Sequence, residues 1–359
     1  MADMMDYLSW RGDILFSQVG LNDVDAMIFS ALAYIRYDGI ISEDLQTSAS
    51  LRTVAKIILA MPEPLRHCRV EKDLALLQAV ADSERFGRVK VTFYRSVFVP
   101  EEETQFAAVT FLLEDGSAVL SFRGTDSTLV GWKEDFNMSF QKSVPAQRLA
   151  QEYTQRFAAF NPRPIRLSGH SKGGNLAVYA GAKCGEQVQD RILEVYNFDG
   201  PGFAAEMMTD PGYVRIQPKV RTLVPQFSVF GMLLEREDNQ QVVLSNASGL
   251  MQHELYSWQV SGKSFVPVQE VTEGSRFLDR TLTTWLEGLT NEERSEFFDS
   301  VFSLLMQENA NYAKDVLRPQ NILATLRSIS LEDGKRRMIG SVLQELLDSA
   351  KAVHNSTQV

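Results

Sequence analysis

The sequence is poor in cysteine and histidine, and it contains no long apolar run. Its 359 residues include two cysteines and four histidines. Cys68 and Cys184 are too few and too far apart for a disulfide framework or a metal cluster, and we expect two reduced thiols in a cytoplasmic protein. No apolar run approaches the ~20 residues of a membrane helix, so we expect no integral membrane segment. The N-terminus, MADMMDYLSWRGDILF, is acidic where a secretory signal would be basic.

An excess of basic residues is also absent. The chain has 36 Lys and Arg against 46 Asp and Glu, which gives a net charge of −10. Nucleic acids and anionic membranes reward clustered Lys and Arg, so this balance argues against both as partners. The apolar fraction of 44% and the charged fraction of 23% are typical of a globular protein. The length suffices for one large catalytic domain and a smaller unit.

Apolar periodicity predicts two early helices, an antiparallel set of strands, and then an alternation of helices and strands. The helices are expected at 22–36, 71–82, 146–160, 172–183 and 203–208. The strands are expected at 88–99, 105–114, 117–122, 165–168, 192–198 and 220–225, with the hairpin signal Asp115-Gly116 between the second and third. This alternation predicts an α/β-hydrolase fold with a mostly parallel central sheet and helices on both faces.

From about residue 270 the pattern is helical without strands. A Thr290…Glu293 capping box precedes a segment with an apolar face, and a second helical pattern begins at Ser330. We therefore divide the chain into a catalytic domain, 1–268, which includes the N-terminal helices, and a helical C-terminal region, 269–359, with a polar tail. The C-terminal helices are a candidate surface for a protein partner.

The stretch RPIRLSGHSKGGNLAVYAG, residues 163–181, carries a Gly-x-Ser-x-Gly pattern between a predicted strand and a predicted helix. A nucleophilic serine in this position lies on a sharp turn with its hydroxyl exposed, so its neighbours must be small. Gly169 and Gly173 meet that need, and the helix N-terminus directs free N–H groups toward the turn. The pattern indicates Ser171 as a nucleophile, and the alternative is a serine in a glycine-rich bend.

A nucleophilic serine needs a base, and the scarcity of histidine narrows the choice. His170 adjoins Ser171, and its side chain is expected to point away from the serine hydroxyl. His67 precedes the predicted sheet, and His354 lies in the polar tail. His253 follows the last predicted strand, where the chain order serine, acid, histidine of α/β-hydrolases places the base. We therefore select His253, with an ordinary loop histidine as the alternative.

Two regions compete to supply the acid. Asp199 directly follows the predicted strand ILEVYNF, where a carboxylate is well placed to orient an imidazole. The rival is the acidic cluster after the next strand, which contains Glu235, Glu237 and Asp238. Carboxylates in a charged surface run usually serve solubility, so we favour Asp199. A third alternative is a structural Asp199 with no discrete acid.

The stretch SFRGTDSTLVGWKEDF is a candidate oxyanion loop. A predicted strand ends at Phe122, and the Arg-Gly-Thr sequence at 123–125 then offers a small residue for close approach and a hydroxyl beside a backbone N–H. We expect Thr125 and the backbone N–H of Lys172 to hold the developing oxyanion. Asp126 is expected to order the loop, and the alternative is an ordinary β-turn.

Together these motifs resemble those of the class 3 (fungal-type) lipases. SFRGTDSTLVGWKEDF is similar to their oxyanion motif, Phe-Arg-Gly-Thr/Ser followed by a tryptophan, here Trp132. LSGHSKGGNLAVYAG resembles their Gly-His-Ser-Leu-Gly-Gly turn, with Lys172 in place of leucine. More closely, YLSWRGDILF, FRGTD…GWKEDFNMSF, GHSKGGNLAVYA, VYNFDGPGF and QHELYSW look like an uncharacterised bacterial α/β-hydrolase-fold family related to those lipases. This resemblance covers roughly residues 5–260.

The resemblance implies that Ser171 is the nucleophile, His253 the base, and Thr125 with Lys172 the oxyanion site. We expect that such a site requires no metal or cofactor. Class 3 lipases usually take the acid after the strand matching 220–225, where this chain reads PQFSVFG. Vertebrate pancreatic-type lipases take it from the end of the preceding strand, where this chain has Asp199. The lysine is expected to add charge at the mouth of the site. The apolar run 227–234 is a candidate acyl pocket or lid, or an ordinary buried segment.

We therefore predict a serine hydrolase, lipase- or esterase-like, that cleaves small-molecule carboxylic esters or lipids such as acylglycerols or phospholipids. The predicted route is a Ser-His-Asp triad and an acyl-enzyme. Two alternatives stay open. The same triad could serve a thioesterase, amidase or acyltransferase, or the fold could be a scaffold that binds a ligand or a partner protein without turnover.

Overall fold

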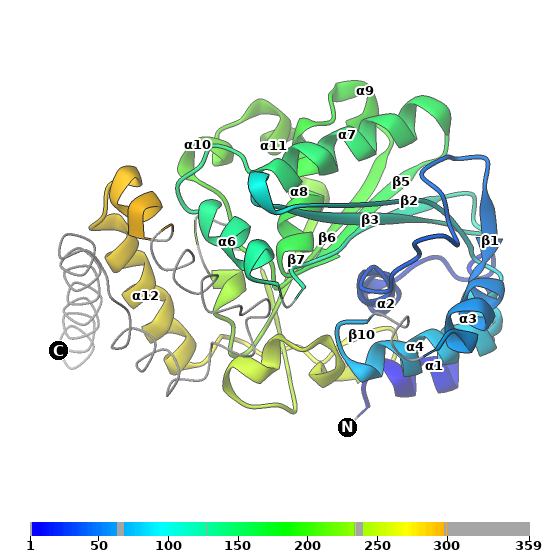
Figure 1. The fold of residues 1–359 in the computed structure, drawn as a ribbon. Coiled ribbons are helices and arrows are strands. Elements are labelled where there is room, and N and C mark those ends of the chain that lie inside the picture. The colour runs from blue at the N-terminus through cyan, green and yellow to red at the C-terminus, as the bar shows by residue number, and fades with distance from the viewer. Residues whose placement is uncertain are drawn as a thin grey trace.

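A computed structural model describes residues 2–62, 68–126, 128–232, 234, 240–297 and 299. Within them an eight-stranded sheet has its strands in chain order, β1 to β8 (Figure 1). The strands are β1 (Ser48–Ser50), β2 (Lys90–Val99), β3 (Thr104–Leu112), β4 (Ala118–Phe122), β5 (Ile165–His170), β6 (Ile192–Phe198), β7 (Val220–Pro225) and β8 (Gln241–Val243). Strands β1 to β4 pair antiparallel, and β4 to β8 pair parallel. The predicted mixed sheet is therefore confirmed.

The hairpin between β3 and β4 forms where its turn residues predict. Gly116 has φ +87°, a conformation that glycine adopts without steric cost. The backbone N–H of Ser117 donates to Oδ1 of Asp115 at 2.9 Å, which fixes the turn. The sequence pattern did not identify β1 and β8, because strands of three residues are too short to show an alternation.

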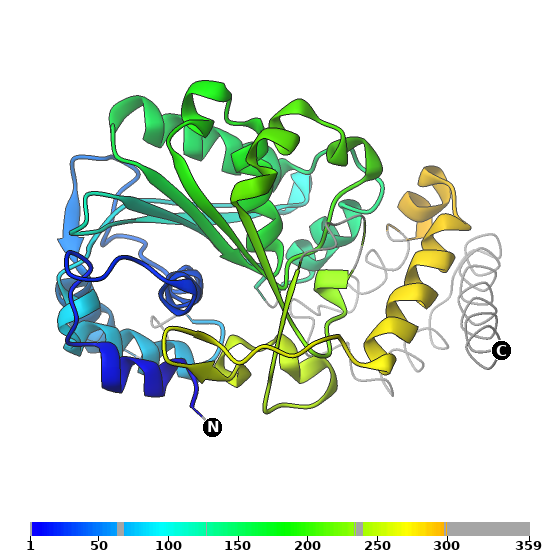
Figure 2. The same ribbon diagram turned by 180° about the vertical axis from the view of Figure 1, so that it is seen from behind.

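Helices cover both faces of the sheet (Figures 1 and 2). One face carries α7 (Pro145–Phe160), α8 (Lys172–Lys183) and α11 (Pro211–Ile216), and the other carries α2 (Asp23–Leu32). Parallel strands in chain order, joined by right-handed crossovers, place their crossover helices on the same face. The N-terminal helices therefore cover the opposite face, and every residue of α2 is buried.

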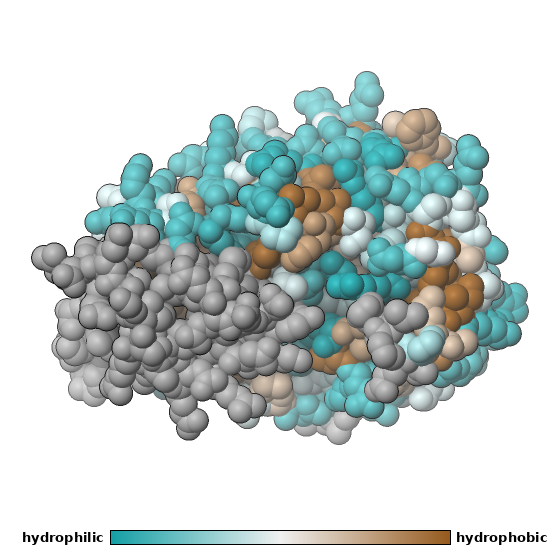
Figure 3. Space-filling model, viewed as in Figure 1, coloured by the Kyte–Doolittle hydropathy of each residue, from teal (hydrophilic) through white to brown (hydrophobic). Residues whose placement is uncertain are grey.

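The remaining elements lie around this three-layer core. They are α1 (Met4–Arg11), α3 (Leu51–Ala60), α4 (Glu71–Asp82), α5 (Glu84–Gly87), α6 (Leu129–Asn137), α9 (Glu186–Gln189), α10 (Ala205–Met208) and α12 (Glu273–Glu287), with a two-stranded hairpin of β9 (Val260–Ser261) and β10 (Ser264–Phe265). On the face seen in Figure 3, the coloured hydrophobic residues form small separate patches among hydrophilic ones. No helix in the described ranges is long and apolar enough to cross a membrane.

Two helical predictions can be checked at their caps. Asn22 caps α2, and its side chain accepts from the backbone N–H groups of Val24 and Asp25. The capping box in the C-terminal region also forms, because the N–H of Thr290 donates to the Glu293 carboxylate at 2.8 Å and the N–H of Glu293 donates to the Thr290 hydroxyl at 3.2 Å. The helical pattern predicted from Ser330 lies outside the described residues, and the domain boundary at 268 stays a prediction.

Candidate active site

Ser171 and Asp199 lie side by side because they follow neighbouring parallel strands. Strand β5 leads into Ser171, and β6 leads into Asp199. The N–H of Ser171 donates to the carbonyl of Phe198, and the N–H of Asp199 donates to the carbonyl of Leu223, both at 2.9 Å. The sheet ladder thus continues one residue beyond each strand. The carboxyl ends of parallel strands meet at one edge, which is where ligand sites of such sheets form.

Ser171 lies on a strained turn between β5 and α8. Its φ of +58° and ψ of −133° belong to a region that residues other than glycine rarely adopt. A nucleophile elbow exposes its serine hydroxyl by such a turn. A side chain at Gly124 would lie 3.2 Å from Cβ of Ser171, so the loop after β4 lies directly against the turn.

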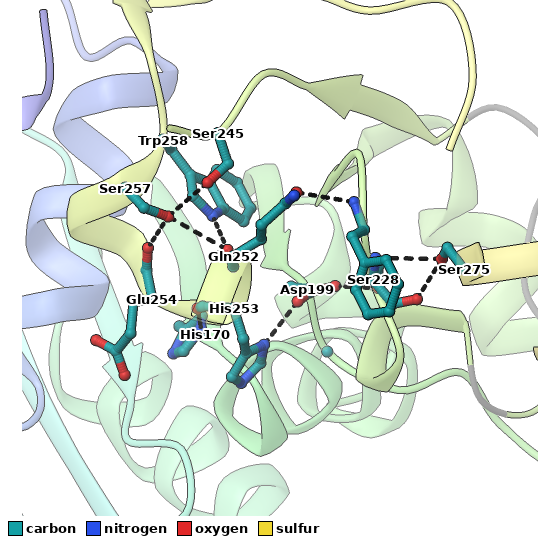
Figure 4. Close-up of polar contacts among 12 residues, drawn as sticks. His170, Asp199, Ser228, Ser245, Gln252, His253, Glu254, Ser257, Trp258 and Ser275 are labelled. Atoms are coloured by element: carbon teal, nitrogen blue, oxygen red, sulfur yellow. Dashed lines mark hydrogen bonds and ion pairs between the residues drawn. The ribbon is translucent and has the colours of Figure 1, made fainter. Parts of the chain in front are cut away.

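Asp199 and His253 are in direct contact. Nδ1 of His253 lies 2.6 Å from Oδ2 of Asp199 (Figure 4). His253 ends the 3₁₀ turn η5 (Gly249–His253), and its side chain is 19% exposed, whereas that of Asp199 is fully buried. A carboxylate at Nδ1 holds the proton there, which leaves Nε2 as the proton acceptor. The rival acids Glu235, Glu237 and Asp238 lie outside the described residues.

His253 is held near the nucleophile turn through His170. Nε2 of His170 lies 2.9 Å from the carbonyl oxygen of His253, and the two ring centroids are 4.4 Å apart. Among the described contacts, no hydrogen bond joins the Ser171 hydroxyl to the His253 imidazole. Catalytic hydrogen bonds are often long without substrate and shorten in the complex. The other histidines of the sequence, His67 and His354, lie outside the described residues.

His170 has a defined protonation pattern. A carbonyl oxygen only accepts, so Nε2 carries the proton, and Nδ1 accepts from the Tyr34 hydroxyl at 2.8 Å. Burial, and then the neighbouring His253, lower the pKa of His170 well below its usual value. A neutral His170 thus connects Tyr34, just beyond α2, with the backbone of His253. No sequence pattern indicates this contact of His170.

We expect the protein to lose stability as the pH falls below about 6.5, and His170→Gln to reduce that loss. The unfolded histidine gains a proton near pH 6.5, whereas the buried one does not. The unfolded state then binds more protons, so the free energy of unfolding falls by at most ~1.4 kcal/mol per pH unit for this group. Above the pKa of the unfolded histidine, the stability that the neutral His170 contributes is fully present. Urea unfolding of the wild type and of His170→Gln between pH 5.5 and 7.5 measures how the free energy of unfolding changes with pH. Equal changes in the two proteins would contradict a buried, neutral His170.

Lys172 is buried, so the expectation that it adds charge at the mouth of the site is wrong. Its Nζ donates to the carbonyl and to Oε1 of Gln105, at 3.0 and 2.9 Å, and to Oε2 of Glu134 at 2.9 Å. The side chains of Lys172 and Glu134 are both 0% exposed. Glu134 also accepts from the N–H groups of Gln105 and Ala146. This buried pair therefore connects the nucleophile helix with β3, α6 and the start of α7.

Lys172→Leu introduces the residue typical of class 3 lipases, and we expect it to destabilise the protein. It leaves Glu134 buried without a cation, and removing one partner of a buried ion pair costs about 3–5 kcal/mol. The double variant Lys172→Leu/Glu134→Gln should recover part of that loss, because a neutral amide needs no counterion. Urea midpoints measure both effects, and a single variant as stable as the wild type would refute the prediction.

Asp135 orders Thr125, a role that the sequence analysis missed. The Thr125 hydroxyl donates to Oδ2 of Asp135, and Nζ of Lys172 lies 3.7 Å from Oδ1. Burial raises the pKa of Asp135 to about 6 against the lowering effects of Lys172 and Thr125. Above about pH 6 Asp135 is ionised, and its carboxylate accepts the hydrogen bond from the Thr125 hydroxyl. Asp126 orders the same loop as predicted, because it accepts from the N–H and hydroxyl of Thr128 at 2.9 and 2.5 Å.

Aromatic rings lie beside the His253 imidazole. The ring centroid of Phe230 is 4.5 Å from that of His253. Trp132 packs edge-on against Phe230, with the two ring centroids 6.2 Å apart. Phe230 begins η4 (Phe230–Met232), a short 3₁₀ turn in the apolar run 227–234. The described part of this run is therefore not a strand. Whether it serves as an acyl pocket or a lid stays a prediction.

The site also contains a hydroxyl that the sequence analysis did not assign. The hydroxyl of Ser228, three residues beyond β7, donates to Oδ1 of Asp199 at 2.5 Å. No sequence signal marks it, because a single serine after a strand is common. The described residues contain no group of three His, Cys, Asp or Glu that could hold a metal ion. Cys184 is buried and Cys68 partly buried, and both are free.

The chain is similar to known proteins in structure and in sequence. Among solved structures, the crystal structure of M37 lipase matches with 16% sequence identity and a TM-score of 0.38, covering 59% of this chain and 70% of that one. No protein with a curated description matches. The relation to class 3 lipases stays a prediction. A model of the Mbeg1-like family matches residues 80–303, which include β2 to β8 and every site residue described above except Tyr34. More than half of the chain is covered, and the protein therefore belongs to the Mbeg1-like family.

Proposed function

We propose that the protein is a serine hydrolase of the lipase or esterase type that cleaves carboxylic esters. The observation that carries the proposal is the contact of the buried Asp199 carboxylate with His253 at 2.6 Å, beside a serine on a strained turn. A buried carboxylate that holds one imidazole nitrogen makes the other a base, and a strained turn exposes a hydroxyl to it. These features together support nucleophilic catalysis by Ser171.

In the proposed mechanism, Nε2 of His253 takes the Ser171 proton as Oγ attacks the ester carbonyl carbon. Asp199 holds the proton at Nδ1 and stabilises the imidazolium. The imidazolium then protonates the leaving alkoxide as its C–O bond breaks, which leaves an acyl-enzyme. Water attacks this ester while His253 accepts its proton. The acid departs, and the proton returns to Ser171.

The proposed oxyanion donors are the backbone N–H groups of Thr125 and Lys172. The Lys172 N–H is at the first position of α8, where an N–H has no partner within the helix. The Thr125 hydroxyl is bonded to Asp135, so its backbone N–H is the donor that we assign. Donors fixed in place before the reaction stabilise the developing charge without reorganisation.

An apolar acyl group is the substrate feature that we favour. Phe230 and Trp132 bring aromatic surface beside His253, where an acyl chain bound at Ser171 would lie. Acylglycerols and phospholipids share this feature. The same triad would also serve a thioester, an amide or an acyl acceptor other than water, and hydrolysis rates for matched oxygen-ester, thioester and amide substrates distinguish these reactions.

Covalent labelling by a fluorophosphonate probe tests the proposal. The folded wild type is expected to react, and mass spectrometry should place the adduct on the peptide that contains Ser171. His253→Ala should slow the reaction strongly, because the serine loses its base. Heat-unfolded protein is the negative control. A folded wild type that is neither labelled nor active on any activated ester would refute the proposal and favour a binding scaffold.

A further inference from the structure

Helix α12 reaches the site through one buried serine. Ser275 is the third residue of α12, and it is fully buried. Its hydroxyl donates to the carbonyl of Ser228, and its oxygen accepts from the N–H of the same residue at 3.2 Å. One side chain thus pairs both backbone polar groups of a buried residue. Figure 4 shows Ser275 beside Ser228, on the opposite side of Asp199 from His253.

Ser228 links Ser275 to Asp199 through its own hydroxyl. Its hydroxyl donates to Oδ1 of Asp199 at 2.5 Å, while Nδ1 of His253 donates to Oδ2 at 2.6 Å. Each carboxylate oxygen therefore has one close donor. The bond from the Ser228 hydroxyl fixes the rotation of the carboxylate, so that Oδ2 faces Nδ1 of His253. A carboxylate held in this orientation accepts the proton on Nδ1 and orients the imidazole.

Close packing around Asp199 restricts the positions that its carboxylate and the Ser228 hydroxyl can take. A side chain at Gly231 would collide with Oδ1 of Asp199 and would lie 2.9 Å from Oγ of Ser228. The turn after Ser228 therefore packs directly over the same carboxylate oxygen. Asp199 is 0% exposed and Ser228 is 1% exposed. If Ser228 moves, Oδ1 of Asp199 is left buried without its donor, which is unfavourable for a charged oxygen.

We propose that Ser275 is a positioning residue of the active site. It holds the backbone of Ser228 so that the Ser228 hydroxyl points at Asp199, and Asp199 in turn orients His253. This inference rests on the proposed function and deepens it. It also makes the first turn of α12 part of the catalytic unit, although the sequence analysis assigned that turn to the C-terminal helical region.

A double-mutant cycle on the turnover number tests the inference. Ser228→Ala and Ser275→Ala are each expected to lower kcat for an activated ester roughly tenfold, with KM nearly unchanged, because each removes a charge-assisted hydrogen bond or its support. The double variant should be no slower than Ser228→Ala alone, since Ser275 acts through Ser228. Multiplicative effects, or an unchanged kcat in Ser275→Ala, would overturn the proposal.

Thr281→Ala is the matched control. Thr281 is a buried residue of the same helix, and its hydroxyl donates to the carbonyl of Phe277 within α12 at 2.8 Å. We expect this variant to lower the melting temperature without lowering kcat. An equal loss of kcat in Thr281→Ala would mean that general loosening of α12 explains the result. If Ser275→Ala does not fold, Ser275→Cys keeps the volume and weakens both hydrogen bonds.

A proton signal separates this inference from the proposed function. The proton on Nδ1 of His253, in a 2.6 Å bond to a carboxylate, should give a far-downfield ¹H NMR resonance. Ser228→Ala and Ser275→Ala should shift or broaden it, and Thr281→Ala should not. This readout needs no turnover. A wild type that is neither labelled nor active, but that gives the variant-sensitive resonance, would refute the proposed function alone. A resonance insensitive to Ser275→Ala would refute the positioning role.

Discussion

Ser171→Ala is expected to abolish ester hydrolysis and fluorophosphonate labelling while leaving the fold intact. Without Oγ no acyl-enzyme forms, and loss of a nucleophilic serine from a triad lowers kcat by roughly 10⁶-fold. The lost hydroxyl has no hydrogen-bond partner among the described contacts, so its removal leaves no buried group unpaired. Steady-state kinetics on an activated ester measures the loss, and the melting temperature checks the fold.

Ser139→Ala is the control for that experiment. Ser139 lies beyond α6, and its described hydrogen bonds are to Phe136, at 2.7 Å, and to Arg294 rather than to the proposed catalytic groups. This variant should keep both turnover and labelling. If Ser171→Ala retained labelling at the wild-type rate, another nucleophile would carry the reaction, and the assignment of Ser171 would be wrong.

Asp199→Asn is expected to lower kcat by about 10⁴-fold, the loss typical when the acid of a triad becomes an amide. Hydrogen bonding explains the size of this effect. An amide nitrogen facing Nδ1 of His253 requires that nitrogen to be unprotonated, so the proton moves to Nε2. The nitrogen that should accept the Ser171 proton is then occupied. KM should change little, because Asp199 is buried behind His253.

Glu194→Gln provides a matched control on the same strand. Glu194 lies on β6 and pairs with Arg166 at 3.1 Å, near the other end of the strand from Asp199. Its amide variant should retain the wild-type kcat. Full activity in Asp199→Asn would instead shift the role of the acid to the cluster of Glu235, Glu237 and Asp238.

Local signals explain which parts of the fold were predictable. The hairpin at Asp115-Gly116 and the cap of α2 at Asn22 depend on a few consecutive residues and their own backbone hydrogen bonds. The glycines around Ser171 likewise mark a sharp turn between a strand and a helix. The short helix α11 was missed, because its six residues are too few to show helical periodicity.

The candidate site was only partly predictable, because local sequence signals mark some of its residues but not the contacts between them. Ser171 follows from the turn motif, and His253 follows because the chain has few histidines. Asp199 was favoured because a carboxylate directly after a strand is well placed to orient an imidazole, but only the folded chain places it 2.6 Å from His253. That contact joins residues 54 positions apart, and no local pattern encodes its distance.

The sequence by itself determined strands β2 to β7, helices α2, α4, α7 and α8, the nucleophile turn and a short list of candidate partners. It could do so because periodicity, capping and turn chemistry act between near neighbours. Only the tertiary structure decided that Lys172 is buried against Glu134, that Asp135 holds Thr125, and that Ser275 reaches Asp199 through Ser228. These contacts depend on which surfaces the sheet and α12 bury together. A buried polar group must find its hydrogen-bond partner wherever the packed chain supplies one, whatever the separation in sequence.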